Sequence, residues 1–304
     1  YNDNEQSYVL SPCFDFSMLN SPGVVMDAWW EAEGGVDGAV LQSTIDQGAS
    51  WKRVGSAGDD DNWYTSNNVI GNPGGQTPGA AEAHGWTNAI SSTIGSFGWN
   101  TARHAVDGLG GAPLVQFRVA FGSNSATSNF DGFAFDDFII TEMPVVNLGP
   151  DTSYCGNSII DAENVGSTIQ WSTGETSQTI NVAVSGEYHA TATGPFGFTS
   201  SDTITMVIRP YPTVNLGTEI FTCGQHTLDA LNPGAEYLWS TGDTTQLVTV
   251  SSSGLFYVDV TVEKCTTRDS VMVDVNAAPI AGFTFTSNTG VVTFSNDSEN
   301  AVHY

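Results

Sequence analysis

Hydrophobic and polar residues alternate along several short stretches of the chain. From Val115 to Phe121 every second residue is apolar, and Gln116 and Arg118 stand between them. This period of two is the pattern of a β-strand with one face in a core and the other toward solvent. The stretch 24–30 follows the same pattern, and no stretch sustains the 3.6-residue period of an amphipathic helix. The chain is therefore predicted to be all-β, with many short strands.

Two later stretches of the sequence repeat each other at a fixed spacing. The matching pairs, each 68 positions apart, are Leu148 and Leu216, Cys155 and Cys223, Trp171 and Trp239, and Gly186 and Gly254. A fixed period of this length indicates a tandem array of small domains. Because each repeat holds several short strands and one tryptophan at a core position, we expect an immunoglobulin-like sandwich in each.

Proline-containing junctions divide the chain into four predicted domains. These are a two-sheet jelly roll at 1–143, immunoglobulin-like sandwiches at 144–210 and 211–276, and an incomplete domain at 277–304. The last segment is too short to bury a core of its own. We therefore expect further chain to complete it.

The charge balance narrows the classes of partner. The chain carries 33 acidic and 7 basic residues, for a formal net charge of −26. Nucleic acids and anionic membrane surfaces need clustered Lys and Arg, so both are excluded as expected partners. The sequence holds no run of 18 apolar residues, and membrane insertion is not expected. The excess of carboxylates supplies the oxygen ligands that Ca²⁺ prefers.

Four cysteines predict one disulfide. Cys223 and Cys265 lie in the second repeat, on strands expected to face each other, and we predict a bridge between them. The first repeat has Phe198–Thr199 where the second has Cys265. Cys155 is therefore interpreted as a buried thiol, with a bridge to Cys13 as the alternative. A disulfide in a strand-rich acidic chain points to a location outside the cytoplasm.

Three acidic residues lie in a strand whose two faces both look apolar. In the stretch 131–140, the adjacent Asp136 and Asp137 point to opposite faces of the expected strand, each among apolar residues, and Asp131 precedes them. A buried carboxylate must be paired. Three interpretations stay open: an ion pair with Arg118, hydrogen bonds to backbone and hydroxyl groups, or a calcium site that includes Asp131, Asp136 or Asp137.

Aromatic residues in a glycine-rich region suggest a platform for a ligand. Trp63 and Tyr64 follow the acidic run 59–61, and Trp86 and Trp99 lie further along. Aromatic faces can stack on sugar rings, so these four residues are candidates for glycan binding. The alternative is that the acidic run is a solvated turn.

The stretch from Thr44 to Trp51 has the spacing Thr-x-Asp-x-Gly-x-Ser-Trp. Asp46 can bond backbone amides across a tight turn, and Gly48 permits a positive φ. We interpret this motif as a structural hairpin. The chain shows no metalloprotease, serine-hydrolase or phosphate-loop motif, and no catalytic residue is assigned.

With these residues identified, the N-terminal block resembles the MAM-like and carbohydrate-binding-like jelly rolls of secreted Bacteroidota surface proteins. The matching stretches are 11–17, 37–42, 46–51, 85–86, 115–118 and 131–137. The repeats resemble the immunoglobulin-like modules of the same proteins, through Cys-Gly, Trp-Ser-Thr-Gly and Ser-Gly at matching places. The tail is similar to the start of a PKD domain. The Asp-Ser/Thr pattern that Bacteroidota O-glycosylate places candidate modification sites at Thr203, Thr244 and Ser270.

The resemblance implies a segment of a large, extracellular cell-surface adhesin or filament protein without catalytic activity. Such proteins are exported by type IX secretion, and some serve gliding motility. The expected partner is a glycan, a protein surface ligand, or further copies of the chain in a filament. The alternative is a carbohydrate-recognition accessory region of a secreted multidomain hydrolase. Calcium is the expected cofactor if the Asp131, Asp136 and Asp137 site exists.

Overall fold

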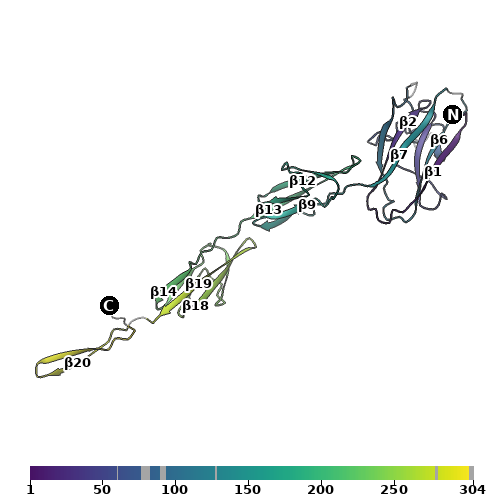
Figure 1. Cartoon of the computed structure of the whole chain (residues 1–304). Coiled ribbons are helices and arrows are strands. Elements are labelled where there is room, and N and C mark those ends of the chain that lie inside the picture. The colour runs from purple at the N-terminus through teal and green to yellow at the C-terminus, as the bar shows by residue number, and fades with distance from the viewer. Residues whose placement is uncertain (60, 77–82, 90–93, 127–128, 278–279, 301–304) are drawn as a thin grey trace. The chain divides into compact units, whose positions relative to one another are not determined.

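The computed structural model describes residues 1–304 except 60, 77–82, 90–93, 127–128, 278–279 and 301–304. The described part is built from strands and one short 3-10 turn, η1 (Pro73–Gly75), which confirms the predicted all-β class (Figure 1). The chain divides into two compact units. One comprises Tyr1–Leu148, Asp161–Gln178 and His189–Thr203, and the other Gly149–Ile160, Thr179–Tyr188 and Ile204–Tyr304. The described residues form no membrane-spanning helix.

The N-terminal block is a sandwich of two antiparallel sheets. One sheet has the order β1 (Gln6–Phe14), β6 (Val115–Gly122), β3 (Gly38–Thr44), β4 (Lys52–Arg53), and the other β5 (Asn100–Ala105), β2 (Pro22–Glu31), β7 (Gly132–Glu142). The alternation predicted in β6 is confirmed, since Val115 and Phe117 are buried while Gln116 and Arg118 are partly exposed. The inward side chains join those of β2 and β3 in one core, which includes Met26 and Leu41.

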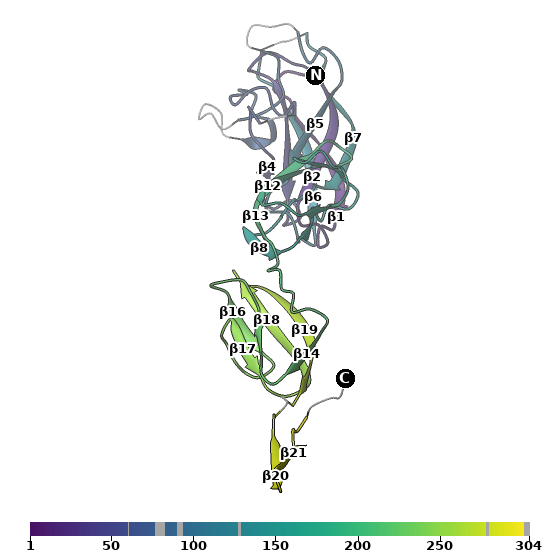
Figure 2. The same ribbon diagram turned by 90° about the vertical axis from the view of Figure 1, so that its left-hand side faces the viewer.

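The two repeats have the same strand order. The first has the sheets β10 (Thr168–Trp171), β12 (Gly186–Thr193), β13 (Thr199–Arg209), β8 (Thr152–Cys155) and β11 (Thr179–Val182), β9 (Ser158–Asp161). The second has β16 (Glu236–Trp239), β18 (Gly254–Val262), β19 (Cys265–Asn276), β14 (Glu219–Cys223) and β17 (Leu247–Val250), β15 (His226–Asp229), and Figure 2 shows its larger sheet. This arrangement is immunoglobulin-like, as the repeat pattern predicts.

The repeated tryptophans occupy equivalent, buried positions. Trp171 and Trp239 are each 2% exposed. The indole N–H of Trp171 donates to the Ser177 carbonyl at 2.9 Å, and that of Trp239 donates to the Thr245 carbonyl at 2.8 Å. Each indole therefore fills the core and satisfies its polar group on a turn of its own repeat.

The predicted Cys223–Cys265 disulfide is wrong. Strand β14 runs parallel to β19 and places Cys223 opposite Asn276, the last residue of β19, whereas Cys265 is the first. At about 3.3 Å per residue, the two cysteines lie roughly 35 Å apart along the strand. Cys265 instead bonds Cys155 of the first repeat, with Cα atoms 5.6 Å apart. Cys155 is thus neither a free thiol nor bonded to Cys13, and Cys13 and Cys223 are both free and exposed.

The C-terminal segment contains a two-stranded hairpin, β20 (Phe283–Asn288) and β21 (Val291–Asn296). Its residues are exposed, and Phe283, Phe285 and Phe294 form ring contacts along it. The resemblance of this segment to a PKD domain stays a prediction, as do the four domain boundaries.

Candidate functional site

The predicted aromatic platform is wrong for three of its four residues. Trp63 and Tyr64 are each 2% exposed and Trp86 is fully buried, so none can stack on a ligand at the surface. Their rings pack together, with 5.1 Å between the centroids of Trp63 and Trp86 and 4.6 Å between those of Tyr64 and Trp86. Trp99 is 57% exposed and stays a candidate.

Hydrogen bonds explain why these polar aromatics lie inside. The indole N–H of Trp63 donates to the Val54 carbonyl at 2.9 Å, and that of Trp86 donates to the Asn62 carbonyl at 2.9 Å. The Tyr64 hydroxyl donates to the Leu41 carbonyl at 2.9 Å, and burial raises the pKa of this phenol. A buried Trp or Tyr costs little when its polar atom is satisfied. These residues therefore tie loops to the core instead of forming a binding surface.

The acidic residues of β7 are exposed, so the expectation of a buried carboxylate is wrong. The pairing of β2 with β7 shifts register between Val25 and Asp27, and Asp137 has a positive φ of 50°. This bulge turns Asp136 and Asp137 to solvent. Arg118 bonds the Gln42 side chain and the Gly74 carbonyl instead.

The described residues contain no group of three or more His, Cys, Asp or Glu side chains placed to hold a metal ion. Asp131, Asp136 and Asp137 do not form one, although all three lie in or beside β7. A calcium site at these residues stays a prediction that this geometry does not support.

The Thr44–Trp51 motif forms the tight turn that its spacing predicts. One oxygen of Asp46 accepts from the Thr44 hydroxyl at 2.6 Å and from the Ser50 amide at 2.9 Å, and the other accepts from the Ser50 hydroxyl. Gly48 has a φ of 87°, which a residue with a Cβ rarely adopts. Trp51 stacks on Arg118, with 4.4 Å from the guanidinium carbon to the ring centroid.

The contribution of this turn to stability is expected to depend on pH. The hydroxyls of Ser50 and Thr44 lower the pKa of Asp46 from 3.8 to about 2. Because the pKa is lower in the folded state, the turn stabilises the fold above the ordinary pKa and loses this contribution as the pH falls from 4 through 2. In thermal melts, Asp46→Asn should lower the melting temperature at pH 6 and approach the parent protein at pH 2. A difference that stays constant between these pH values would contradict this assignment.

A pocket of about 490 Å³ lies between the edge strands β4 and β5 of the N-terminal sandwich. We call it the polar pocket. Its hydroxyl-bearing and charged lining residues are Ser43, Thr44, Ser50, Lys52, Arg53, Ser56, Asp59, His104 and Asp107. Ser43 and Thr44 are themselves buried, and the Thr44 hydroxyl is already bonded to Asp46. The polar pocket is the place where hydroxyls, carboxylates and cations of the N-terminal block converge.

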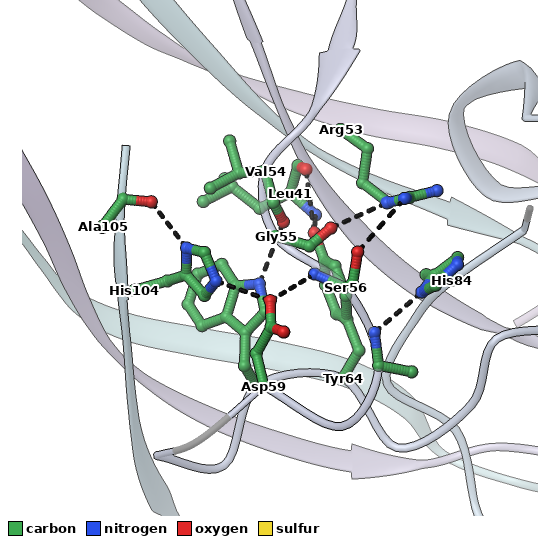
Figure 3. Close-up of polar contacts among 12 residues, drawn as sticks. Leu41, Arg53, Val54, Gly55, Ser56, Asp59, Tyr64, His84, His104 and Ala105 are labelled. Atoms are coloured by element: carbon green, nitrogen blue, oxygen red, sulfur yellow. Dashed lines mark hydrogen bonds and ion pairs between the residues drawn. The ribbon is translucent and has the colours of Figure 1, made fainter. Parts of the chain in front are cut away.

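A contact between His104 and Asp59 closes one wall of the polar pocket (Figure 3). His104 Nε2 lies 2.7 Å from Asp59 Oδ2, which also accepts from the Ser56 amide at 2.7 Å. His104 Nδ1 lies 2.5 Å from the carbonyl oxygen of Ala105. Because a carbonyl oxygen only accepts hydrogen bonds, Nδ1 is the nitrogen that donates to Ala105. Burial raises the pKa of Asp59, but the Ser56 amide and His104 outweigh it and hold the pKa below its usual value.

The opposite wall holds two of the seven basic residues of the chain, Lys52 and Arg53. The Arg53 Nε donates to the Gly55 carbonyl at 2.7 Å, which fixes the guanidinium beside Ser56 (Figure 3). Lys52 is exposed at the mouth. The polar pocket thus holds two positively charged residues beside the carboxylates of Asp59 and Asp107.

Both ring nitrogens of His104 lie against oxygen atoms of the protein, those of Ala105 and Asp59. In this arrangement neither nitrogen faces a hydroxyl group that it could activate as a nucleophile. What the polar pocket offers is a set of donors and acceptors at fixed positions. Such a set suits a ligand rich in hydroxyl groups.

A second, apolar cleft of about 390 Å³ lies on the other open side of the sandwich, between β1 and β7. Val9, Leu10, Phe135 and Phe138 line it, with Arg118 at one side. Sequence reasoning missed both clefts, because each is made where two edge strands from different sheets meet.

The three candidate O-glycosylation residues are accessible. Thr203 lies on β13, Thr244 in a turn and Ser270 on β19, and all three are exposed. The hydroxyl of Thr203 also contacts His189 Nδ1 at 3.0 Å. Their modification stays a prediction.

No protein-family model and no curated protein matches the sequence. Among solved structures, extracellular domains 3–5 of Drosophila OTK cover 90% of this chain and 92% of their own, with 11% identity and a TM-score of 0.30. The DIP-gamma IG1+IG2 structure covers 41% of this chain and 93% of its own, with 11% identity and a TM-score of 0.23. The titin fragment I67–I69 covers 43% and 64%, with 12% identity and a TM-score of 0.23. These similarities are too remote to carry a functional inference.

Proposed function

We propose that the chain is a non-catalytic segment of an extracellular cell-surface protein, in which the N-terminal sandwich binds a glycan and the repeats act as spacers. The observation that carries the binding function is the polar pocket between β4 and β5, where hydroxyls and two scarce cations converge. The extracellular location is supported by the Cys155–Cys265 disulfide, because such bonds persist in oxidising compartments. Export by type IX secretion and a role in gliding stay predictions.

The chemistry of the polar pocket favours a saccharide that carries a carboxylate. Lys52 and Arg53 stand beside the serine hydroxyls, and a guanidinium or ammonium group binds a carboxylate with short, strong hydrogen bonds. The sugar hydroxyls can meet Asp59, Asp107 and the serines. Long-range repulsion from the net charge of −26 falls off beyond about 8 Å at physiological salt, while contacts inside the pocket persist.

A glycan array probed with the full chain tests this function, with neutral and acidic saccharides as separate arms. We expect acidic saccharides to be retained, and Lys52→Gln to weaken their binding by about tenfold or more, since a hydrogen bond to a charged group is worth about 1.5–3 kcal/mol. The matched control is Lys264→Gln, which removes the same charge from the second repeat. Failure to bind any saccharide, or equal loss in both variants, would count against the proposal.

A further inference from the structure

The Cys155–Cys265 disulfide joins two different repeats. Cys155 ends β8 of the first repeat and Cys265 begins β19 of the second, 110 residues later. A disulfide within one repeat would constrain that repeat alone. This one instead closes a covalent ring that contains β9–β13 of the first repeat and β14–β18 of the second.

Further contacts surround the disulfide within the second compact unit. Arg209, at the end of β13, pairs with Glu263 of the β18–β19 turn at 3.1 Å. The Cys155 sulfur lies 3.9 Å from the Lys264 carbonyl oxygen. The Tyr211 ring covers Gly156 so closely that a Cβ there would come within 2.8 Å of it. The disulfide is therefore accompanied by an ion pair and a ring contact close to it.

The connectivity determines where tension passes when the chain is pulled at its two ends. Force enters the first repeat along β8, crosses the sulfur–sulfur bond, and leaves along β19. Residues 156–264 form a side loop that carries no tension while the bond is intact. We propose that this disulfide is a mechanical bypass, which keeps both repeats from being extended under load. This function does not depend on the polar pocket.

The disulfide keeps a long stretch of chain out of the path of tension. An extended chain spans at most about 3.6 Å per residue, so the sequence separation of 110 corresponds to roughly 40 nm of contour. With the bond intact, the two Cα atoms stay 5.6 Å apart. The two strands that remain in the tension path are β8 and β19. Each pairs in parallel with a strand inside the ring, β8 with β13 and β19 with β14.

Single-molecule stretching of the full chain, held by handles at both termini, tests this proposal. The oxidised protein should release about 40 nm less contour than Cys155→Ser or Cys265→Ser. Cys223→Ser is the matched control, because it removes a free exposed thiol and should match the parent protein. A dithiol reductant gives the same comparison without mutation: the disulfide takes up two electrons and two protons to give two thiols, and the reductant becomes a disulfide.

Peptide mapping of the oxidised protein by mass spectrometry provides the second measurement. We expect one linked peptide pair that contains Cys155 and Cys265. Equal contour release before and after reduction would overturn the proposal. So would a linked pair that contains Cys223, whose loop to Cys265 would withhold only about 15 nm.

Discussion

Replacing Cys155 by serine should lower the free energy of unfolding of the repeats by about 4–5 kcal/mol, the cost in chain entropy of releasing a loop of this length. The disulfide spans 110 residues. When only one repeat unfolds, a shorter loop of about half that length is released, and halving a loop changes the closure term by only about 0.6 kcal/mol. Both repeats are therefore expected to lose stability.

Hydrogen exchange followed by mass spectrometry measures this effect on the full chain, because peptides from β10 and β16 report on each repeat separately. About 4 kcal/mol corresponds to a loss of roughly a thousandfold in protection wherever exchange requires unfolding of the repeat. Cys223→Ser is the control and should leave protection unchanged, since that thiol is free. Unchanged protection in Cys155→Ser, or a loss in Cys223→Ser, would contradict the assignment of the bond.

The fold class was readable from the sequence because it depends on local periodicity. The alternation from Val115 to Phe121 needs only that one face of β6 meets a core, and the structure places Val115 and Phe117 there. Trp171 and Trp239 likewise occupy the same position in the two repeats, and both residues are buried. A period in the sequence identifies the buried face only where one face is buried. In the stretch 24–30 the consecutive residues Val24, Val25 and Met26 are all buried, so the one-sided pattern predicted there was wrong.

The disulfide could not be predicted from periodicity, because its position depends on the direction of neighbouring strands. The prediction assumed that Cys223 and Cys265 meet across facing strands. In fact β14 pairs with β19 in parallel, and this sets Cys223 beside Asn276 at the far end of the strand. Nothing in the residues of β14 distinguishes a parallel from an antiparallel neighbour. One sequence signal pointed to a bond between repeats: Cys155 has no partner cysteine in its own repeat, which has Phe198–Thr199 where the second repeat has Cys265.

The polar pocket could not be predicted from local sequence patterns either. Its charged members come from separate segments, with Lys52 and Arg53 on β4, Asp59 in a loop and His104 on β5. Only the closure of the sandwich brings them together. One sequence signal was present: in a chain with 7 basic residues, two of them are adjacent.

The buried aromatic cluster of the N-terminal sandwich, once interpreted as a platform, is expected to be essential for its stability. Trp86→Ala should destabilise the N-terminal sandwich by about 3–5 kcal/mol, the usual cost of removing a large buried aromatic side chain. Trp86 is fully buried, contacts the rings of Trp63 and Tyr64, and stacks on Phe133 with a centroid distance of 5.3 Å. The substitution also leaves the carbonyl of Asn62 without its indole donor.

Trp99→Ala is the matched control for this substitution, because Trp99 is 57% exposed and its removal should change stability by no more than about 0.5 kcal/mol. Urea denaturation of the full chain, followed by hydrogen exchange in peptides from β2, β3 and β6, measures both variants against the same core. If Trp86 instead served a ligand at the surface, its alanine variant would keep the parent stability and lose only binding. We expect the opposite pattern, in which Trp86→Ala weakens the fold and Trp99→Ala leaves it unchanged. The reason is that the buried indoles of Trp63 and Trp86 are held in the core by backbone carbonyls.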